Sequence, residues 1–574
     1  MLANDLEIPV KKPRTFVSNE LEINSWEALK PYFEDLKNRP VNSVGELEQW
    51  MLDRSELDAV LEEDMGWRYI RMSIDTTSKE LADQFHFFVS EIHPKVAPYD
   101  DAFNRKLMDS PYLNELQEEG YETYLRRVRK EIEIYRDENV PLLSQLEAEQ
   151  QKYGAIAAAM TVEVEGKELT LQQAAKYLKR TDRSMREQVY TQIVNRRAQD
   201  VDALNELYTD LIAKRDRVAH NAGFSNYRDY MFAAMGRFDY TPQDCFDFHE
   251  AIAKEVVPVL DEWQEEHRSK LGVDPLKPWD LDVDAEGKEP LQPFEEANEL
   301  ISKSVKCFNK INPYFGERLA IMQEMKHLDL ASKTGKAPGG FNYPLYEIGV
   351  PFIYMNAVGT HQDLITMVHE GGHAIQSFLN IDLKLTAFKD LTSEVAELAS
   401  MSMELISMDG WDEFYTNPEE LKRAKVEQLH RALETLPWVA TIDKFQHWVY
   451  ENPTHTVAER EAKWNEIMDA FGSHVVDWSG YESARTNLWQ KQLHLFEVPF
   501  YYIEYAMAQL GAIAVWRNYR QNPERAIQQY MDALSLGYTK TIGEIYETAG
   551  IEFNFSQAYV KELVDFVKAE LAKL

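Results

Sequence analysis

The 574-residue chain carries 97 acidic and 62 basic side chains, which gives a formal net charge of −35 at pH 7. Nucleic-acid binding requires a basic surface that contacts phosphates, so this composition argues against a nucleic-acid partner. Hydrophobic residues make up 44% of the chain, enough for a large core, and two cysteines cannot form a disulfide framework, which favours a reducing compartment. Neither a signal-peptide core nor a run of about 18 apolar residues is present, so we expect a cytoplasmic protein with no membrane partner.

Helical patterns dominate the first half of the chain. Residues from about 20 to 150 have the periodicity of helices with charged faces. The segment Met160–Leu171 differs, because alternating apolar residues flank Glu-Gly-Lys-Glu, which is typical of a short hairpin. Helices then resume through Phe232. The segment Ser269–Ala297 is rich in Pro, Gly and Asp, which predicts a long irregular connection.

A second region with strand character precedes the most informative helix. Gly335–Thr360 contains glycines, prolines, aromatic residues and a short apolar run. The remainder, to Leu574, is again helical. The sequence therefore predicts a mainly α fold with a small β-sheet next to the helix that follows Thr360.

That helix, Asp363–Asn380, carries a pair of histidines in an amphipathic pattern. His369 and His373 are four positions apart, so both imidazoles lie on one helix face. Two such nitrogens can occupy two corners of a zinc tetrahedron at about 2.0–2.1 Å, and Glu370 can then take a proton from a metal-activated water. The alternative is a pair of hydrogen-bonded histidines in a buried helix.

Two glycines interrupt the same helix. Gly371 and Gly372 each cost about 1 kcal/mol relative to alanine in a helix interior. We interpret them as leaving room for substrate beside the metal; the alternative is that they let another helix pack closely. Thr360, with Asp363 three residues later, predicts a capping box at the start of the helix.

A catalytic zinc needs a third protein ligand and an open position. The next predicted helix, Leu391–Met408, contains Glu394, Glu397 and Glu404. Glu397 and Glu404 share a face because they are seven positions apart, and Glu394 shares that face only partly. Spacing does not choose among the three. We expect one to bind the metal and another to orient a ligand histidine.

Four segments together resemble the thimet oligopeptidase / oligoendopeptidase F family of zinc metallopeptidases. They are HEGGHA (369–374), AELAS (396–400), KAPGGF (336–341) and PFYYIEYA (499–506). The resemblance covers roughly residues 150–574. It implies a mainly α, large two-lobed helical body around a deep substrate channel, with a small β-sheet next to the HExxH helix.

The resemblance also implies roles for individual residues. It places one Zn²⁺ per chain on His369, His373 and Glu397, with Glu370 as the general base. Glu404 then falls where the family has an acid that supports the ligands. The residue pattern itself thus indicates a metal site with a general base, and the resemblance to the family implies which glutamate binds the metal.

Substrate-facing residues are implied in the same way. His494, Tyr502 and Tyr505 match the family segment that stabilises the oxyanion, and the two tyrosines, three positions apart, are expected to share a helix face. Gly339 and Gly340 match a segment that offers backbone groups to a peptide in strand fashion.

We therefore predict a zinc-dependent endopeptidase that hydrolyses internal peptide bonds of oligopeptides, with residues 1–150 as an N-terminal helical region and 151–574 as the zinc peptidase catalytic region. Gly371 stands where better-known members have a larger residue, which bears on specificity. One alternative is a zinc carboxypeptidase or dipeptidase of the same family, which would need a basic residue for the terminal carboxylate. The other is a non-catalytic helical binding protein with a vestigial metal site, against which the presence of Glu370 argues.

Overall fold

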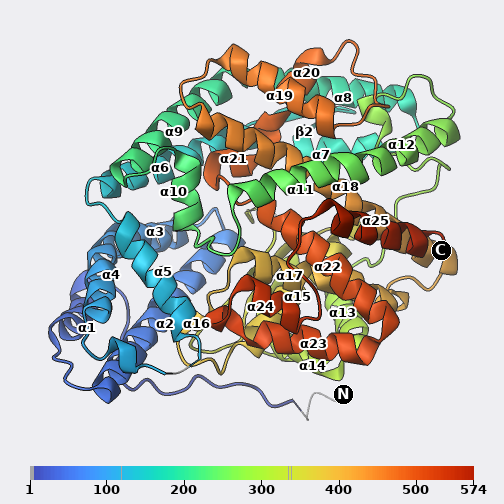
Figure 1. Ribbon diagram of the computed structural model, residues 1–574. Coiled ribbons are helices and arrows are strands. Elements are labelled where there is room, and N and C mark those ends of the chain that lie inside the picture. The colour runs from blue at the N-terminus through green and yellow to red at the C-terminus, as the bar shows by residue number, and fades with distance from the viewer. Residues whose placement is uncertain (1–5, 118, 334, 338) are drawn as a thin grey trace. The chain divides into compact units, whose positions relative to one another are not determined.

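The computed structural model describes residues 6–117, 119–333, 335–337 and 339–574 (Figure 1). Helices account for most of these residues and strands for few, so the predicted mainly α fold is confirmed. The chain divides into two compact units, each assembled from three separate segments. Unit 1 consists of residues 1–133, 291–428 and 511–553, and unit 2 of residues 134–290, 429–510 and 554–574. The boundary near residue 150 and the substrate channel stay predictions.

The N-terminal segment of unit 1 is a helical layer with its own apolar core. Ser43 caps its longest helix by accepting a hydrogen bond from the backbone N–H of Glu46. Inside, Trp50 is fully buried and donates its indole N–H to the carbonyl oxygen of Leu36 at 2.8 Å. The elements are α1 (Trp26–Asn38), α2 (Val44–Ile74), α3 (Lys79–Phe87), the π-helix η2 (Phe88–Ile92), α4 (His93–Met108), the 3₁₀-helix η3 (Leu113–Glu115) and α5 (Tyr121–Ile134).

A three-stranded sheet also belongs to unit 1. It contains β3 (Leu328–Ala331), β4 (Phe341–Tyr343) and β5 (Phe352–Ala357), in the order β3-β5-β4. β5 is almost wholly buried, as its apolar run requires of a central strand, and pairs parallel with β3 and antiparallel with β4. The predicted strands before the histidine helix are thus confirmed, whereas β3 lies before the predicted region.

The remaining helices of unit 1 include the histidine helix and the helices packed around it. α15, the histidine helix, packs against β4, β5 and α17, so the predicted position of the sheet is confirmed. The elements are α13 (Ala297–Ile311), α14 (Pro313–Glu324), α15 (His361–Leu379), α16 (Thr386–Lys389), α17 (Ser393–Ile406), the 3₁₀-helix η6 (Ser407–Glu413), the start of α18 (Pro418–Glu451), the end of α22 (Ile503–Gln521), α23 (Pro523–Ser535), the 3₁₀-helix η8 (Gly537–Thr539) and α24 (Ile542–Thr548).

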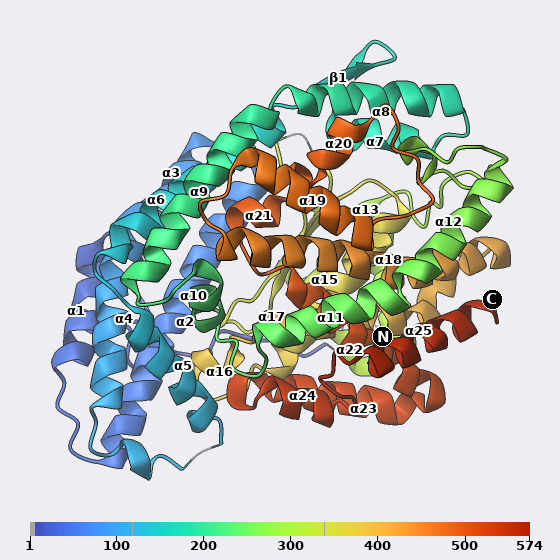
Figure 2. The ribbon, with the colours of Figure 1, turned by 45° about the horizontal axis from the view of Figure 1, so that its top comes forward.

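Unit 2 is helical apart from one hairpin. The predicted hairpin is confirmed: β1 (Thr161–Val164) pairs with β2 (Lys167–Thr170), and the turn residues Glu165 and Gly166 both have positive φ, as a tight hairpin turn requires. Both ribbon views show α11 and α25 side by side (Figures 1 and 2).

The helices of unit 2 are α6 (Asn139–Ala158), α7 (Leu171–Ala175), α8 (Arg183–Ala198), α9 (Val201–Asn221), α10 (Tyr227–Ala234), α11 (Pro242–Glu255), α12 (Val257–Leu271), the end of α18, α19 (Val457–Phe471), α20 (Glu482–Thr486), α21 (Leu493–Glu497), the start of α22 and α25 (Gln557–Leu571), with 3₁₀-helices η4 (Lys176–Lys179), η5 (Pro278–Asp280) and η7 (Leu488–Lys491). The irregular connection between α12 and α13 is confirmed, because η5 is its one helical turn in the described chain. Among the described helices, none is both long and apolar enough to cross a membrane.

Candidate active site

The histidine helix α15 begins with the predicted capping box. The hydroxyl of Thr360 accepts a hydrogen bond from the backbone N–H of Asp363, and the Asp363 carboxylate accepts one from the backbone N–H of Thr360 at 2.8 Å. Both contacts satisfy N–H groups that the first turn of a helix leaves without partners. The cap fixes the residue at which α15 starts. It thereby helps to fix the direction in which the side chains of His369 and His373 point from the helix.

Those two histidines meet one glutamate of α17. The donor atoms of His369, His373 and Glu397 all lie within 4.8 Å of one another. Oε2 of Glu397 is 3.3 Å from Nε2 of His369 and 3.8 Å from Nε2 of His373. Glu394 is buried on the same helix but is not part of this group of donors. Of the three glutamates that spacing left open, the structure brings Glu397 to the histidine pair.

Glu404 contacts the other ring nitrogen of His369. Its Oε1 accepts a hydrogen bond from Nδ1 of His369 at 2.7 Å, and its Oε2 accepts one from Nε2 of Gln428 at 2.9 Å. A proton held on Nδ1 leaves Nε2 of His369 available as a ligand atom. Gln428 was missed by the sequence analysis, because nothing in its local sequence connects it with the histidine helix.

The environment shifts the pKa values of Glu397 and His373 in the directions that metal binding requires, whereas the pKa of His369, which burial would lower, is raised well above its usual value by the hydrogen bonds with Glu397 and Glu404. Burial would raise the pKa of Glu397, but the hydrogen bond from His369, the charges of both histidines and the hydrogen bond from Ser400 lower it to about 2. Burial lowers the pKa of His373 to about 4. Near neutral pH, Glu397 is therefore charged and His373 is neutral, which are the forms that bind a cation.

Glu370 is set apart by its burial. Its residue exposure is 7%, and burial raises the pKa of its carboxyl to about 7. The carboxylate also accepts a hydrogen bond from the backbone N–H of Asn342, in the edge strand β4. A carboxyl group with a pKa near the working pH can both take and return a proton.

The two glycines of α15 face neighbouring helices. A Cβ atom on Gly372 would lie 2.6 Å from the Cα of Ser400 and 2.7 Å from the carbonyl oxygen of Ala399, both in α17. A Cβ atom on Gly371 would lie 2.6 Å from the ring of Phe308 in α13. The interpretation that these glycines leave room for substrate beside the metal is therefore wrong, and close helix packing explains them.

Gly339 and Gly340 lie in the loop that leads into β4. Gly339 has a φ of +101°, which favours glycine, and its carbonyl oxygen accepts a hydrogen bond from Nδ2 of Asn356 at 3.0 Å. A Cβ atom on Gly340 would lie 3.2 Å from the carbonyl oxygen of Tyr354 in β5. Gly340 thus lets this loop approach β5 closely, whereas Gly339 permits the positive φ of the turn, and the contact of both with substrate stays a prediction.

The aromatic residues predicted to face substrate gather in unit 2. The His494 ring centroid is 4.8 Å from that of Tyr502 and 5.9 Å from that of Tyr505, and the two tyrosine rings are 5.5 Å apart. The expectation of a shared helix face is wrong, because α22 begins at Ile503 and Tyr502 lies in the preceding turn. Tyr501 is half-buried, and its ring also lies 5.4 Å from that of Tyr505.

A strained turn at Phe500 positions this group. Phe500 has a φ of +69°, a conformation that costs a residue with a side chain about 1–2 kcal/mol. Its N–H donates to Oε1 of Gln446 at 2.7 Å, and its carbonyl oxygen accepts from Arg237, which also binds Glu504 at 2.7 Å. Burial raises the pKa of the Tyr502 phenol to about 12, so it remains a hydrogen-bond donor at neutral pH. Arg237 and Gln446 carried no local signal in the sequence.

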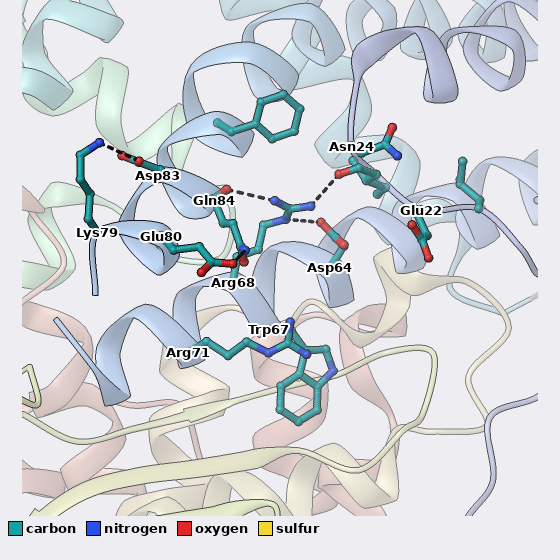
Figure 3. Close-up of a pocket in the computed structure, with 13 residues that line it drawn as sticks. Glu22, Asn24, Asp64, Trp67, Arg68, Arg71, Lys79, Glu80, Asp83 and Gln84 are labelled. Atoms are coloured by element: carbon teal, nitrogen blue, oxygen red, sulfur yellow. Dashed lines mark hydrogen bonds and ion pairs between the residues drawn. The ribbon is translucent and has the colours of Figure 1, made fainter. Parts of the chain in front are cut away.

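A separate surface cavity in unit 1 contains none of the predicted site residues. It has a volume of about 850 Å³ and is lined by α2, α3 and the segment before α1 (Figure 3). Arg68 crosses it, bound to Asp64 at 2.6 Å and to the carbonyl oxygens of Gln84 and Ile23. The guanidinium group of Arg68, which crosses the cavity, is thus already paired within the protein.

Comparisons with known proteins show the family to which the chain belongs. The model of the peptidase M3 N-terminal domain matches residues 16–152, and that of peptidase family M3 matches residues 176–565. An oligoendopeptidase F homolog of Borreliella burgdorferi is 21% identical, covering 100% of this chain and 94% of its own. Oligopeptidase A of Haemophilus influenzae is 22% identical over 51% of this chain and 52% of its own. The solved structure of PZ peptidase A with an inhibitor superimposes with a TM-score of 0.90 at 28% identity, covering 98% of this chain and 99% of that one. The chain belongs to peptidase family M3.

Proposed function

We propose that the protein is a zinc-dependent endopeptidase that cleaves internal peptide bonds of oligopeptides. The observation that carries the proposal is the convergence of one donor atom each from His369, His373 and Glu397 within 4.8 Å, with Glu370 next in sequence to His369. Two imidazoles and one carboxylate make a donor set typical of catalytic zinc, because three protein ligands leave a position open. The membership in family M3 and the names of the oligopeptidase relatives support the same reading.

The residues around the metal-binding donors have different roles in the proposed reaction. Zinc bound there would supply a Lewis acid that lowers the pKa of water and polarises a carbonyl group. Glu370 takes the proton of the attacking water and returns it to the leaving amine, which its pKa of about 7 suits. Glu404 holds the proton on Nδ1 of His369 and so fixes the orientation of that ring.

Substrate binding is assigned to the β4 edge of the small sheet. In the order β3-β5-β4, β4 is an edge strand, so an extended peptide can add to it through main-chain hydrogen bonds. Glu370 contacts the same strand through Asn342, which couples the base to the segment that positions the peptide. Gly339 and Gly340 lead into β4 and extend this surface. Main-chain recognition of this kind accepts many side chains.

Stabilisation of the oxyanion is assigned to the aromatic group of unit 2. Tyr502 and Tyr505 offer phenol donors, and His494 lies against both rings. Nδ1 of His494 is 2.7 Å from Nε2 of Gln492, and Oε1 of Gln492 accepts from the indole of Trp438 at 2.9 Å. This chain of hydrogen bonds fixes the imidazole, so that it can assist a phenol without reorganising.

A digest of defined peptides tests the proposal. The parent protein and Glu370→Gln are each incubated with peptides of about ten residues, with free and with amidated C-termini, and the products are identified by mass spectrometry. We expect internal cleavage of both peptides by the parent, loss of cleavage on chelation and its return with zinc. The exposed Glu419→Gln serves as the matched control and should cleave like the parent. Removal of one or two residues at a time from free C-termini alone would instead indicate a carboxypeptidase or dipeptidase.

A further inference from the structure

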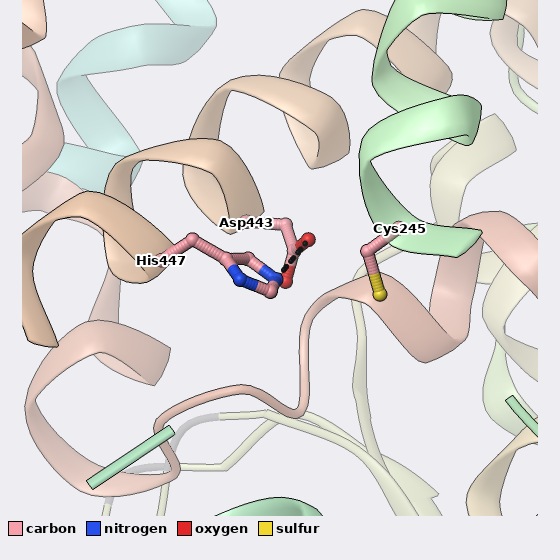
Figure 4. A group of neighbouring side chains, drawn as sticks. All are labelled: Cys245, Asp443 and His447. Carbon is pink, nitrogen blue, oxygen red and sulfur yellow. Dashed lines mark ion pairs between the residues drawn. The ribbon is translucent and has the colours of Figure 1, made fainter. Parts of the chain in front are cut away.

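A second group of side chains that could hold a metal ion lies inside unit 2, where α11 faces α18 (Figure 4). The donor atoms of Cys245 on α11 and of Asp443 and His447 on α18 all lie within 4.8 Å of one another. Residue exposures are 0%, 0% and 1%, respectively. Asp443 and His447 are four positions apart, so they occupy one face of α18. None of the three belongs to the candidate active site.

The Asp443 carboxylate needs compensation for its burial. A buried carboxylate costs several kcal/mol unless a cation or sufficient hydrogen bonds offset its lost hydration. Within ion-pair distance in the described chain are only two imidazoles: Nε2 of His249 lies 2.8 Å and Nε2 of His447 lies 3.3 Å from Oδ2 of Asp443. Oδ1 of Asp443 has no hydrogen-bond partner among the described residues. Neither lysine nor arginine supplies the missing positive charge.

Two kinds of cation could supply it, an imidazolium or a bound metal ion. An imidazolium carries two N–H donors, and both need acceptors when the ring is buried. Nδ1 of His447 has no acceptor in the described chain, and Nε2 makes only the 3.3 Å ion-pair contact with Asp443. Its ring lies instead against the rings of Phe246 and Phe500, at 4.8 and 5.5 Å. These surroundings do not suit an imidazolium, whereas a metal ion would use the lone pair of His447 and the free oxygen of Asp443.

We propose that Cys245, Asp443 and His447 form a second metal site, which takes Zn²⁺ or a divalent cation of the same preference. A thiolate, an imidazole and a carboxylate suit zinc or cobalt, whereas Mg²⁺ and Ca²⁺ take oxygen ligands. Binding exchanges the thiol proton of Cys245 for the metal ion, and the proton leaves to solvent. His249 holds the second oxygen of Asp443 and so orients this ligand. The site adds one ion to the single zinc that the family resemblance implies.

The site would also stiffen the turn that carries the aromatic group. The ring of Phe500 packs on His447, and Gln446, next to His447 in sequence, accepts the hydrogen bond from the Phe500 N–H. Phe500 is the strained residue directly before Tyr501 and Tyr502. A metal ion on His447 therefore helps to hold this turn in its left-handed conformation. It acts by positioning, because it does not itself contact the aromatic group.

Metal content measured without the first site tests the proposal. In the full-length His369→Ala/His373→Ala variant, we expect about one equivalent of zinc after reconstitution and desalting. Adding Cys245→Ser should remove it, whereas adding Cys307→Ser, the matched control at the other buried cysteine, should not. This background lacks the proposed catalytic ligands, so the result is independent of whether the protein is a zinc peptidase. Absence of bound zinc in a folded His369→Ala/His373→Ala protein would overturn the proposal.

Cobalt gives a second readout, which identifies the ligand. The same background variant reconstituted with Co²⁺ should show a thiolate-to-cobalt charge-transfer band in the near ultraviolet, and Cys307→Ser should keep it. Asp443→Asn, which retains both cysteines, should weaken cobalt binding and the band, and guards against misfolding of Cys245→Ser. A folded cobalt protein without the band would show that no cysteine binds the metal, and the proposed site would then be wrong.

Discussion

Oε1 of Glu404 lies 2.7 Å from Nδ1 of His369, and the second oxygen of the same carboxylate is held by Gln428 at 2.9 Å. Glu404 thus connects a residue near the start of α18 to the imidazole whose other nitrogen faces Glu397. The contact holds a proton on Nδ1 and fixes the ring orientation of His369 before any metal binds.

Glu404→Gln should therefore weaken zinc binding while leaving the ligands in place. The amide still accepts a hydrogen bond, but it lacks the charge that makes the imidazole a stronger donor of electrons to the metal. Loss of such a supporting group typically costs about 10–100-fold in metal affinity. Competition with a chelator of known affinity would measure the change. Glu394→Gln, at another buried glutamate of α17, is the control and should bind zinc like the parent; equal affinities for all three proteins would contradict the role of Glu404.

Glu370→Gln should retain zinc and lose turnover. Glutamine can hold a water molecule but cannot take its proton, and general-base catalysis typically contributes about 10²–10⁴-fold. We expect kcat to fall by that factor with KM nearly unchanged, because the proton moves only in the transition state. Steady-state kinetics on a quenched-fluorescent peptide, combined with elemental analysis, would check this. Turnover at the parental rate would exclude Glu370 as the base.

Zinc binding should release a proton from His369. Burial would lower the pKa of this imidazole in the metal-free protein, but the hydrogen bonds with Glu397 and Glu404 raise it well above its usual value. Below that pKa the imidazole is doubly protonated, so zinc must displace the Nε2 proton while Glu404 keeps the one on Nδ1. His373 and Glu397, with pKa values of about 4 and about 2, have none to release at neutral pH.

Calorimetric titration in two buffers of different ionisation enthalpy would count the proton. The measurement belongs at about pH 8, above the pKa of Glu370 near 7, and in Cys245→Ser, so that neither of these groups contributes. We expect at least one proton per zinc, because a water on the ion would add to the proton from His369 at this pH, and zinc affinity that falls as the pH is lowered. Glu404→Gln should release less, because it removes one of the two contacts that raise the pKa of His369. Equal heats in both buffers would contradict the assignment.

Gly372→Ala should destabilise the fold although alanine favours helices. The new Cβ atom would lie 2.6 Å from the backbone of Ser400, and overpacking of this kind costs about 1–3 kcal/mol, more than the roughly 1 kcal/mol that alanine gains in a helix. A lower midpoint of thermal unfolding would show it. Gly543→Ala in α24 is the matched control, because its Cβ atom would meet nothing within 4 Å, and its midpoint should not fall. Parental stability of Gly372→Ala would mean that α15 and α17 can separate freely.

The sequence predicted those elements whose pattern is local. The helices, the hairpin at Thr161–Thr170 and the capping box at Thr360 each follow from residues a few positions apart, and all are present. β3 was missed because it pairs in parallel with β5, a partner that does not adjoin it in the sequence. Tyr502 was wrongly placed on one helix face with Tyr505, because Phe500 adopts a positive φ before α22 although it is not a glycine.

The candidate site divides in the same way. The spacing of His369 and His373 is a local signal, and the structure brings the two together with Glu397. The choice among Glu394, Glu397 and Glu404 depends on how α17 crosses α15, which spacing within one helix cannot show. Cys245 lies nearly 200 residues before Asp443, so its approach to that residue follows from tertiary packing alone.

Tyr502→Phe and Tyr505→Phe test the assignment of the oxyanion donors. A phenol hydrogen bond that forms only in the transition state lowers the barrier without tightening substrate binding, and removal of one such donor costs about 10²–10³ in kcat. We expect at least one variant to show that loss with KM and zinc content near parental values. Tyr501→Phe is the matched control, because its ring belongs to the same group but no role in catalysis is assigned to it. If both variants change KM alone, these phenols bind substrate only. If neither changes either constant, the oxyanion donor lies elsewhere, and the aromatic group serves packing around His494.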